Sequence, residues 1–316
     1  MTDLNIASTG ESSSQILREP IEGRNEQVVN LTWLYNGNKI ICGTIGGTLE
    51  IWNVEQKQLI YKIKTGGWDS NRLVRLTSDE KKILAGSFKK LRLFNLGSGE
   101  LLWNRKVGTS PPYAYAPVLN GLVLSHKTNR IFILSINKIK ILDLNSGDIL
   151  TKFKGGKGFL NSLAITPDSK NVLWNDERKK IRIYDISLNE IVDVIRPKKI
   201  GKVEKIAFSP DGKYMITGES NGTLKIWDYP SKNVIQNIIG HKRGVHSILV
   251  SPDNKYIITS SYDKERTIKI WDIPSGELKR TLLGHSKAIN DVILAPDGRY
   301  IASGSSDSTV RLWKLY

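Results

Sequence analysis

Hydrophobic positions in this chain form short runs rich in β-branched residues, and residues 203–239 show the pattern most clearly. This stretch contains four such runs, VEKIAFS, YMITGE, TLKIWDY and NVIQNII, and each predicts a strand. A Pro-Asp-Gly turn follows the first run, and the tight hairpin turn Ser220-Asn221-Gly222 follows the second. Because the runs are largely apolar on both faces, we expect a four-stranded sheet that a neighbour covers on each side.

The same pattern occurs seven times along the chain. Each copy contains a hydrophobic tetrad such as Ile51-Trp52-Asn53-Val54, and the second residue of the tetrad returns after 42 to 48 residues. These second residues are Trp52, Phe94, Leu142, Tyr184, Trp227, Trp271 and Trp313. A sheet with two apolar faces is not soluble alone, whereas seven such sheets packed radially bury each other's faces. The sequence therefore predicts an all-β fold, a seven-bladed β-propeller.

Blades five to seven carry residues that resemble the WD-repeat β-propeller family. The resemblance rests on the pairs Trp227-Asp228, Trp271-Asp272, Gly240-His241 and Gly284-His285, and on the turns that begin at Ser209, Ser251 and Ala295. Blades one to four are degenerate, because three of them lack the tryptophan and no Gly-His pair precedes them. The resemblance covers residues 15–316, which we interpret as a single propeller domain. It implies a role as a rigid scaffold in multiprotein assemblies.

The two ends of the chain are expected to meet in the last blade. Tyr316 comes just after the third strand of that blade, so the C-terminal end supplies no outer strand. Residues 15–21 align with residues 277–283, the outer strand of the preceding blade. We therefore predict that an N-terminal strand completes the last blade and removes an open sheet edge. Residues 1–14, which are rich in Ser and Thr without periodicity, are predicted to form a flexible tail.

The resemblance also implies a buried hydrogen-bond chain of His, Ser or Thr, Asp and Trp within a blade. The matching residues are His285, Ser303, Asp307 and Trp313 in blade seven, and His241, Thr259, Asp263 and Trp271 in blade six, with a two-residue insertion after Asp263. In blade five, Lys199 stands where the histidine would be. A Ser-His-Asp set also suggests a hydrolase, but a buried indole and imidazole need hydrogen-bond partners in any case. We interpret both sets as structural.

No catalytic, cofactor-binding or metal site is predicted. The strand–turn–helix motif that exposes a nucleophile is absent, and the four histidines have no ligand spacing. Gly155-Gly156-Lys157-Gly158 joins two predicted strands and lacks the helix that would complete a phosphate-binding loop. The sequence thus favours a protein that is not an enzyme and needs no cofactor.

Composition narrows the setting of the protein. The 316 residues include one cysteine, Cys42, which excludes a disulfide framework and a thiolate metal site and favours a reducing, cytoplasmic compartment. No apolar run is long enough for a transmembrane segment, and the N-terminus lacks the features of a secretory signal. A closed ring buries its own sheet faces, so self-assembly is not required.

The positive charge is unevenly distributed. Residues 65–199 hold most of the net charge of +16, whereas residues 1–64 hold none of it. The resemblance implies that the connections between blades and the second-to-third strand turns emerge on one face, where cations and aromatic residues gather. The predicted partner-binding face comprises Trp68, Arg72, Lys89, Lys90, Tyr113, Tyr115, Lys138, Lys157, Arg178, Lys179, Lys180, Lys198, Lys199, Lys202, Lys242, Arg243 and His246.

Several kinds of partner fit such a face. The first hypothesis is an acidic protein or peptide, which the cations attract and the aromatic residues anchor. The second is RNA or DNA, whose phosphates the cations neutralise and whose unpaired bases stack on the aromatic residues. A phosphoinositide is disfavoured, because His241-Lys242-Arg243-Gly244 lacks the aromatic-Arg-Arg pattern of lipid-binding propellers. A lysine-rich face that serves only solubility is the alternative to all three.

Overall fold

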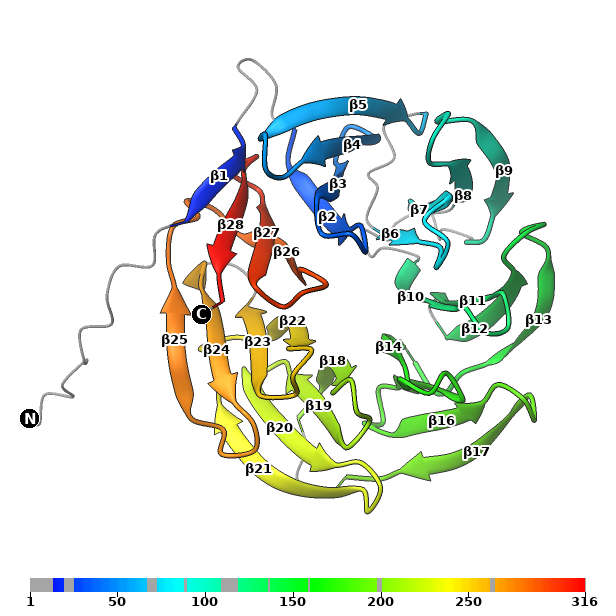
Figure 1. Cartoon of the computed structure of the whole chain (residues 1–316). Helices are drawn as coiled ribbons and strands as arrows, with labels where there is room; N and C mark the ends of the chain where they lie inside the picture. The colour runs from blue at the N-terminus through cyan, green and yellow to red at the C-terminus, as the bar shows by residue number, and fades with distance from the viewer. Residues whose placement is uncertain are drawn as a thin grey trace, which may run out of the picture.

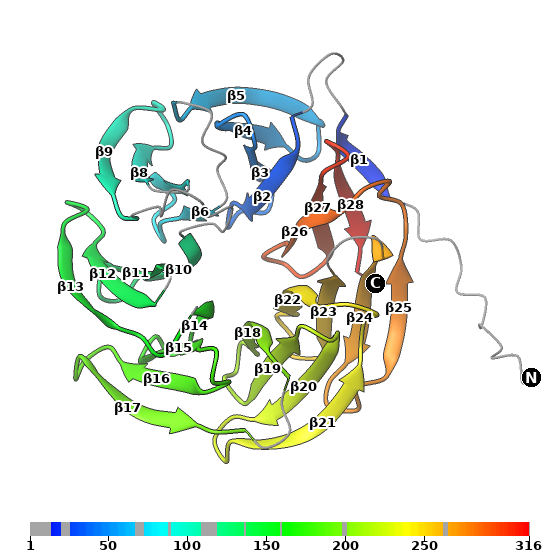
Figure 2. The ribbon, with the colours of Figure 1, turned by 180° about the vertical axis from the view of Figure 1, so that it is seen from behind.

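Seven four-stranded antiparallel sheets form a closed ring, as the two opposite views in Figures 1 and 2 show. The computed structural model describes residues 14–19, 26–66, 73–87, 90–108, 119–135, 137–158, 160–197, 201–261 and 265–315, apart from the side chains of residues 119 and 120. Each sheet is one blade, with its first strand nearest the centre of the ring. The predicted seven-bladed propeller is confirmed.

The strands of the first four blades follow chain order from the centre outward. Blade one consists of β2 (Val28–Trp33), β3 (Lys39–Thr44), β4 (Thr48–Asn53) and β5 (Gln58–Lys64). Blade two consists of β6 (Leu73–Leu76), β7 (Lys82–Gly86), β8 (Lys90–Asn95) and β9 (Leu101–Lys106). Blade three consists of β10 (Leu119–Ser125), β11 (Arg130–Ser135), β12 (Lys138–Asp143) and β13 (Ile149–Lys154). Blade four consists of β14 (Asn161–Ile165), β15 (Asn171–Asn175), β16 (Ile181–Asp185) and β17 (Glu190–Ile195).

The remaining blades keep this order until the ring closes. Blade five consists of β18 (Val203–Phe208), β19 (Tyr214–Glu219), β20 (Thr223–Asp228) and β21 (Asn233–Ile239). Blade six consists of β22 (Val245–Val250), β23 (Tyr256–Ser261), β24 (Ile268–Asp272) and β25 (Leu278–Leu282). Blade seven consists of β26 (Ile289–Leu294), β27 (Tyr300–Ser305), β28 (Val310–Lys314) and, as its outer strand, β1 (Gln15–Arg18).

Closure joins the two ends of the chain as the sequence predicted. Strand β1 pairs antiparallel with β28, with Gln15 opposite Leu312 and Ile16 opposite Arg311. The blue and red strands therefore lie side by side in Figure 1. Just before β1, Ser14 accepts a hydrogen bond from Arg311 at 2.8 Å. Residues 1–13, most of the expected tail, lie outside the described residues.

Apolar side chains fill the space between neighbouring blades. The core between blades one and two, for example, combines Leu49 and Ile51 with Ile83 and Phe94, all of them buried. Seven such clusters occupy the ring, and each takes residues from two adjacent blades. This packing explains why the second and third strands are apolar on both faces.

The disc has two distinct ends. On one end, which we call the loop face, the connections leaving or entering a blade bond to the turn between its second and third strands. Gly155 N, for example, donates to Asn137 O at 3.0 Å, and Ser306 N donates to Ala288 O at 2.9 Å. On the other end, the turn face, Tyr229 N donates to Lys213 O at 2.9 Å and links the two remaining turns of a blade. In the described part of the chain, the inter-blade connections in these examples thus lie on the loop face.

At the seam between blades seven and one, an acidic side chain occupies a third-strand position that is basic in the other six blades. Two residues before the tetrad's second residue, the third strand carries a cation in six blades, namely Arg92, Lys140, Arg182, Lys225, Lys269 and Arg311, whereas blade one carries Glu50. The partner of Glu50 is Arg18 of β1, whose Nε lies 2.7 Å from Glu50 Oε2. Both side chains are completely buried. A buried ion pair between Arg18 of blade seven and Glu50 of blade one therefore links the two blades at which the ring closes.

The outer strands carry one extra residue each against the third strand. In blade three, Thr151 faces Ile141 and Ile149 faces Leu142, so Leu150 has no partner in the ladder. The same register shift occurs in blades one, two, four, five and six. Strand β1 of blade seven shifts in the same way, because Ile16 faces Arg311 and Arg18 faces Val310. The exposed rim of the disc is therefore bulged in all seven blades.

Candidate partner-binding surface

In blade seven, four side chains are hydrogen-bonded in series below the loop face. His285 Nδ1 lies 2.8 Å from Asp307 Oδ2, and His285 Nε2 lies 2.7 Å from Ser303 Oγ. Trp313 Nε1 donates to the same hydroxyl at 2.8 Å. Asp307 also accepts from the backbone N–H of Ser286 at 3.0 Å. The series thus ties the connection from blade six to the hairpin turn of blade seven.

Blade six contains the same series with a different carboxylate. His241 Nε2 and Trp271 Nε1 each lie 2.8 Å from Thr259 Oγ1. His241 Nδ1 lies 3.1 Å from Oε2 of Glu265, the residue in the place that we assigned to Asp263. Asp263 itself lies outside the described residues. The insertion therefore precedes the carboxylate instead of following it.

The sequence does contain a signal for Glu265. Aligned backward from the third strand, ERTIKIW of blade six matches DSTVRLW of blade seven, which places Glu265 on Asp307. The residue after each acid, Arg266 and Ser308, has a left-handed φ of 49° and 69° respectively. The equivalent turn geometry explains why the longer loop can present its carboxylate to the same imidazole position.

Blades five and one retain only part of the series. In blade five, Trp227 Nε1 donates to Thr217 Oγ1 at 3.0 Å, while Lys199 lies outside the described residues. In blade one, Trp52 Nε1 donates to Glu50 at 3.2 Å, so the seam ion pair also holds the indole. The series therefore varies between blades, and each variant holds an indole N–H, that of the buried Trp227 in blade five and of the partly buried Trp52 in blade one.

We expect the stability of the protein to fall as the pH is lowered from about 6.5 to about 4. Burial lowers the pKa of His241 to about 4, although Glu265 opposes this shift and Lys269 reinforces it. The unfolded chain therefore binds more protons than the folded chain in this range, and acid favours unfolding. Denaturant midpoints measured against pH should show a shallower decline for His241→Gln. The variant should still lose some stability in acid, because the pKa of His246 is also lowered to about 4. A decline identical to that of the wild type would contradict the assignment to His241.

The predicted partner-binding residues that the structure describes lie on or near the loop face. Lys90, Lys138, Lys157, Arg178, Lys179, Lys202, Lys242 and Arg243 are exposed, and Lys180 is half-buried. His246 differs, because its side chain lines the central channel. The remaining positions lie outside the described residues, namely Trp68, Arg72, Lys89, Tyr113, Tyr115, Lys198 and Lys199.

Strand register gathers four lysines on one face of blade three. Lys138 of β12 lies opposite Lys154 of β13, and Lys140 lies opposite Lys152. Directly opposed residues point to the same side of a sheet, so these four residues form a lysine cluster. The Lys140 ammonium donates to Val107 O of the connection from blade two, which locates the cluster beside that blade. Among the described residues, none of the four forms an ion pair.

A third like-charged pair lies in the neighbouring blade. Lys90 of β8 faces Lys106 of β9 across the outer pair of strands in blade two. Burial, together with Lys138 and Lys152, lowers the pKa of Lys140. Lys106, Lys140, Lys152 and Lys154 are missing from our predicted face. For the residues of blade three, the alternating lysines of KIK at 138–140 and KFK at 152–154 were a signal, but only the strand register shows that they oppose one another.

Acidic side chains on the turn face accept hydrogen bonds within their own turns. Asp211 Oδ1 accepts from Lys213 N at 3.0 Å and from Ser209 Oγ at 2.5 Å, and Asp253 repeats this pattern in the next blade. Each carboxylate fixes its turn and is followed two residues later by a lysine. Charges therefore alternate along the turn face, in contrast to the cluster of like charges in blade three.

Two other kinds of site receive no support from the described part of the chain. It holds no group of three or more His, Cys, Asp or Glu side chains that could ligate a metal ion. It also contains no helix with the length and apolarity needed to cross a membrane.

Two family models match parts of this chain. The model of the WD domain, G-beta repeat, matches residues 276–314. The model of the anaphase-promoting complex subunit 4 WD40 domain matches residues 171–252. These matches lie in blades four to seven, which include the three blades with the clearest repeats.

Several named proteins resemble the chain over most of its length. A putative BTB/POZ domain and WD-repeat protein of Acanthamoeba polyphaga mimivirus is 21% identical, covering 71% of this chain and 38% of the viral protein. Human cilia- and flagella-associated protein 52 is 24% identical, covering 80% of this chain and 40% of the human protein. U3 small nucleolar RNA-associated protein 4 of Saccharomyces cerevisiae is 20% identical, covering 72% and 31%. This chain therefore spans two fifths or less of these relatives.

Proposed function

This chain is a WD-repeat β-propeller protein, and on that premise we propose that it is a non-enzymatic scaffold that docks an acidic protein or peptide on its loop face. Its WD-repeat relatives suggest an interaction role within complexes. The docking surface is centred on blades two and three, at the lysine cluster and the Lys90–Lys106 pair.

The observation that carries this proposal is the opposition of like charges in blade three. Like charges directly across an antiparallel pair cost roughly 0.2–1 kcal/mol, so the rungs Lys138–Lys154 and Lys140–Lys152 work against the fold. Carboxylates of a bound partner would turn this repulsion into attraction and would speed the encounter. The lysine cluster therefore destabilises the folded protein but would favour binding of an acidic partner.

The hydrogen-bonded series in blades six and seven supports a rigid platform. His285 and His241 tie inter-blade connections to neighbouring turns, so these parts of the loop face have little freedom to lose on binding. A preordered surface avoids part of the entropy cost of association.

The proposal is tested with two charge reversals that should leave the fold intact. Lys138→Glu with Lys152→Glu converts each rung into an opposite-charge pair, so stability should stay constant or rise slightly. Binding of a fluorescent polyglutamate peptide, measured by anisotropy at low salt, should weaken about tenfold or more. The matched control, Lys170→Glu with Lys213→Glu, reverses two exposed lysines on the turn face. Equal losses for both double variants would refute the docking surface.

RNA is the second candidate, because one relative is named as associated with a small nucleolar RNA. Phosphate neutralisation by the same lysines would give binding that falls steeply with salt. The anisotropy experiment is therefore repeated with a single-stranded RNA oligonucleotide. Tight RNA binding that the cluster variant loses, together with no binding of polyglutamate, would replace the acidic-protein proposal with this one.

A further inference from the structure

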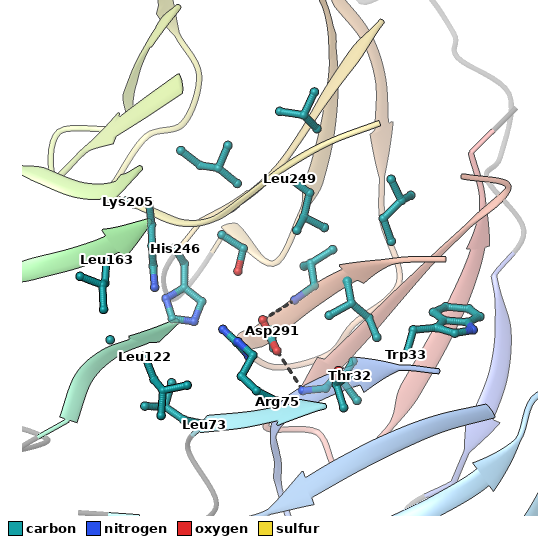
Figure 3. A pocket seen from close by; sticks show the side chains of 18 of the residues that line it. Thr32, Trp33, Leu73, Arg75, Leu122, Leu163, Lys205, His246, Leu249 and Asp291 are labelled. Atoms are coloured by element: carbon teal, nitrogen blue, oxygen red, sulfur yellow. Dashed lines mark hydrogen bonds between the residues drawn. The ribbon is translucent and has the colours of Figure 1, made fainter. Parts of the chain in front are cut away.

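The innermost strands enclose a central cavity of about 530 Å³ with two unlike halves. Towards the turn face its wall is mainly apolar and includes Trp33 and Leu249. Nearer the loop face, Arg75, Lys205 and Asp291 project into it from blades two, five and seven, as Figure 3 shows. These charged groups are far apart in the sequence and meet only because the ring closes.

The carboxylate of Asp291 is already engaged by the surrounding fold. Its Oδ2 accepts from Leu31 N at 2.9 Å and from Asn30 Nδ2 at 2.8 Å, both in blade one. Its Oδ1 accepts from Val292 N at 3.0 Å. Asp291 therefore joins blade seven to blade one, and neither Arg75 nor Lys205 is in ion-pair contact with it within the described residues.

The two cations have unused hydrogen-bonding capacity. Arg75 Nη1 donates to Val74 O at 2.8 Å, which leaves donors of its guanidinium directed into the cavity. Among the described residues, the Lys205 ammonium makes no hydrogen bond or ion pair. The carboxylate of the adjacent residue, Glu204, lies 3.4 Å from the ammonium of the exposed Lys202. Burying cationic groups without hydrogen-bond acceptors destabilises the fold, and a bound anion that accepts their hydrogen bonds would offset this cost.

The neighbouring histidine is not a third cation at neutral pH. His246 Nε2 lies 2.6 Å from Asn290 O, and burial, reinforced by Lys205, lowers the pKa of His246 to about 4. Burial also raises the pKa of Asp291, so a strongly charged anion could enter with uptake of one proton. Burial lowers the pKa values of Arg75 and Lys205, although Asp291 opposes both shifts, so a bound anion would stabilise the charged forms of the two basic side chains.

We propose that the central channel binds a small phosphate-bearing molecule, with its phosphate held between Arg75 and Lys205. The planar fork of arginine and the point charge of lysine are a common pair for phosphate. The volume lies in the range of small-molecule sites, and the apolar wall towards the turn face accommodates an ester group. This inference is independent of the docking surface on blades two and three.

Thermal unfolding and calorimetry of the full chain test the proposal. Inorganic phosphate and glycerol phosphate should each raise the melting temperature in a saturable way, compared with chloride at equal ionic strength. A larger rise with glycerol phosphate identifies an ester as the ligand, and equal rises identify free phosphate. Equal stabilisation by acetate, or none beyond chloride, would overturn the proposal.

Two channel variants separate the site from general charge effects. Lys205→Met should melt no lower than the wild type without phosphate, because it removes an uncompensated cation, and should bind phosphate about ten- to a hundredfold more weakly. Arg75→Lys keeps the charge but loses the fork, and should weaken binding as well. Lys255→Met on the turn face is the matched control and should bind as the wild type does. Unchanged affinity in both channel variants would sink the assignment.

Discussion

Replacing Arg18 with methionine should lower the free energy of unfolding by about 3–5 kcal/mol, the usual effect of removing one partner from a buried ion pair. The Arg18 guanidinium contacts Glu50 at 2.7 Å and also donates to the backbone oxygens of Glu26 and Ser308. Without it, among the described residues, the buried Glu50 carboxylate keeps Lys62, at 2.9 Å, as its one charged partner. Burial acts to raise the pKa of Glu50, but Arg18 and Lys62 outweigh it and hold this pKa below its ordinary value.

Denaturant titration of four proteins makes this prediction specific. The double variant Arg18→Met with Glu50→Met should recover much of the loss, because two apolar side chains leave no unpaired charge. Arg105→Met removes an exposed partner of Asp148, and should cost no more than about 1 kcal/mol. If Arg18→Met unfolds at the same denaturant concentration as Arg105→Met, the seam ion pair does not hold the ring closed.

Replacing Thr259 with valine should cost about 2–4 kcal/mol, because two buried groups lose one shared partner at once. The Thr259 hydroxyl is completely buried and bridges His241 Nε2 and Trp271 Nε1, both at 2.8 Å. Valine has nearly the same shape, so the effect reports unsatisfied hydrogen bonds and not a cavity. Chemical denaturation followed by tryptophan fluorescence measures the change.

Blade five offers a matched comparison for this prediction. Thr217 is equally buried, but among the described residues its hydroxyl serves only the indole of Trp227, at 3.0 Å. Thr217→Val should therefore cost about 1–3 kcal/mol, roughly half the effect of Thr259→Val. Equal costs in the two blades would indicate that His241 gains nothing from its hydroxyl contact.

The fold was predictable because its signals are local and repeated. Each blade contains its own hairpin turns and its own tetrad, so the seven copies reinforce one interpretation. Closure followed from the same logic, since residues 15–21 resemble an outer strand. Such features need only the period of the pattern and not the contacts between distant residues.

The surface and channel residues needed information that the repeat does not contain. Leu150 adds one residue to β13, so the opposition of Lys140 and Lys152 depends on a bulge that the sequence does not mark. Arg75 and Lys205 share a cavity because separate innermost strands face the same axis, which their sequence separation conceals. Asp263 was chosen in place of Glu265 because the blade was aligned forward from its second strand, whereas the insertion precedes the carboxylate that contacts His241.

The bulged rim has a consequence for how copies of this protein can meet. The outer strands expose Leu and Ile side chains, and a straight edge of that composition would invite another chain to extend the sheet. One surplus residue per outer strand breaks the spacing that continuous intermolecular hydrogen bonding needs. The rim is therefore a poor template for cross-β fibres, even where many copies are crowded together.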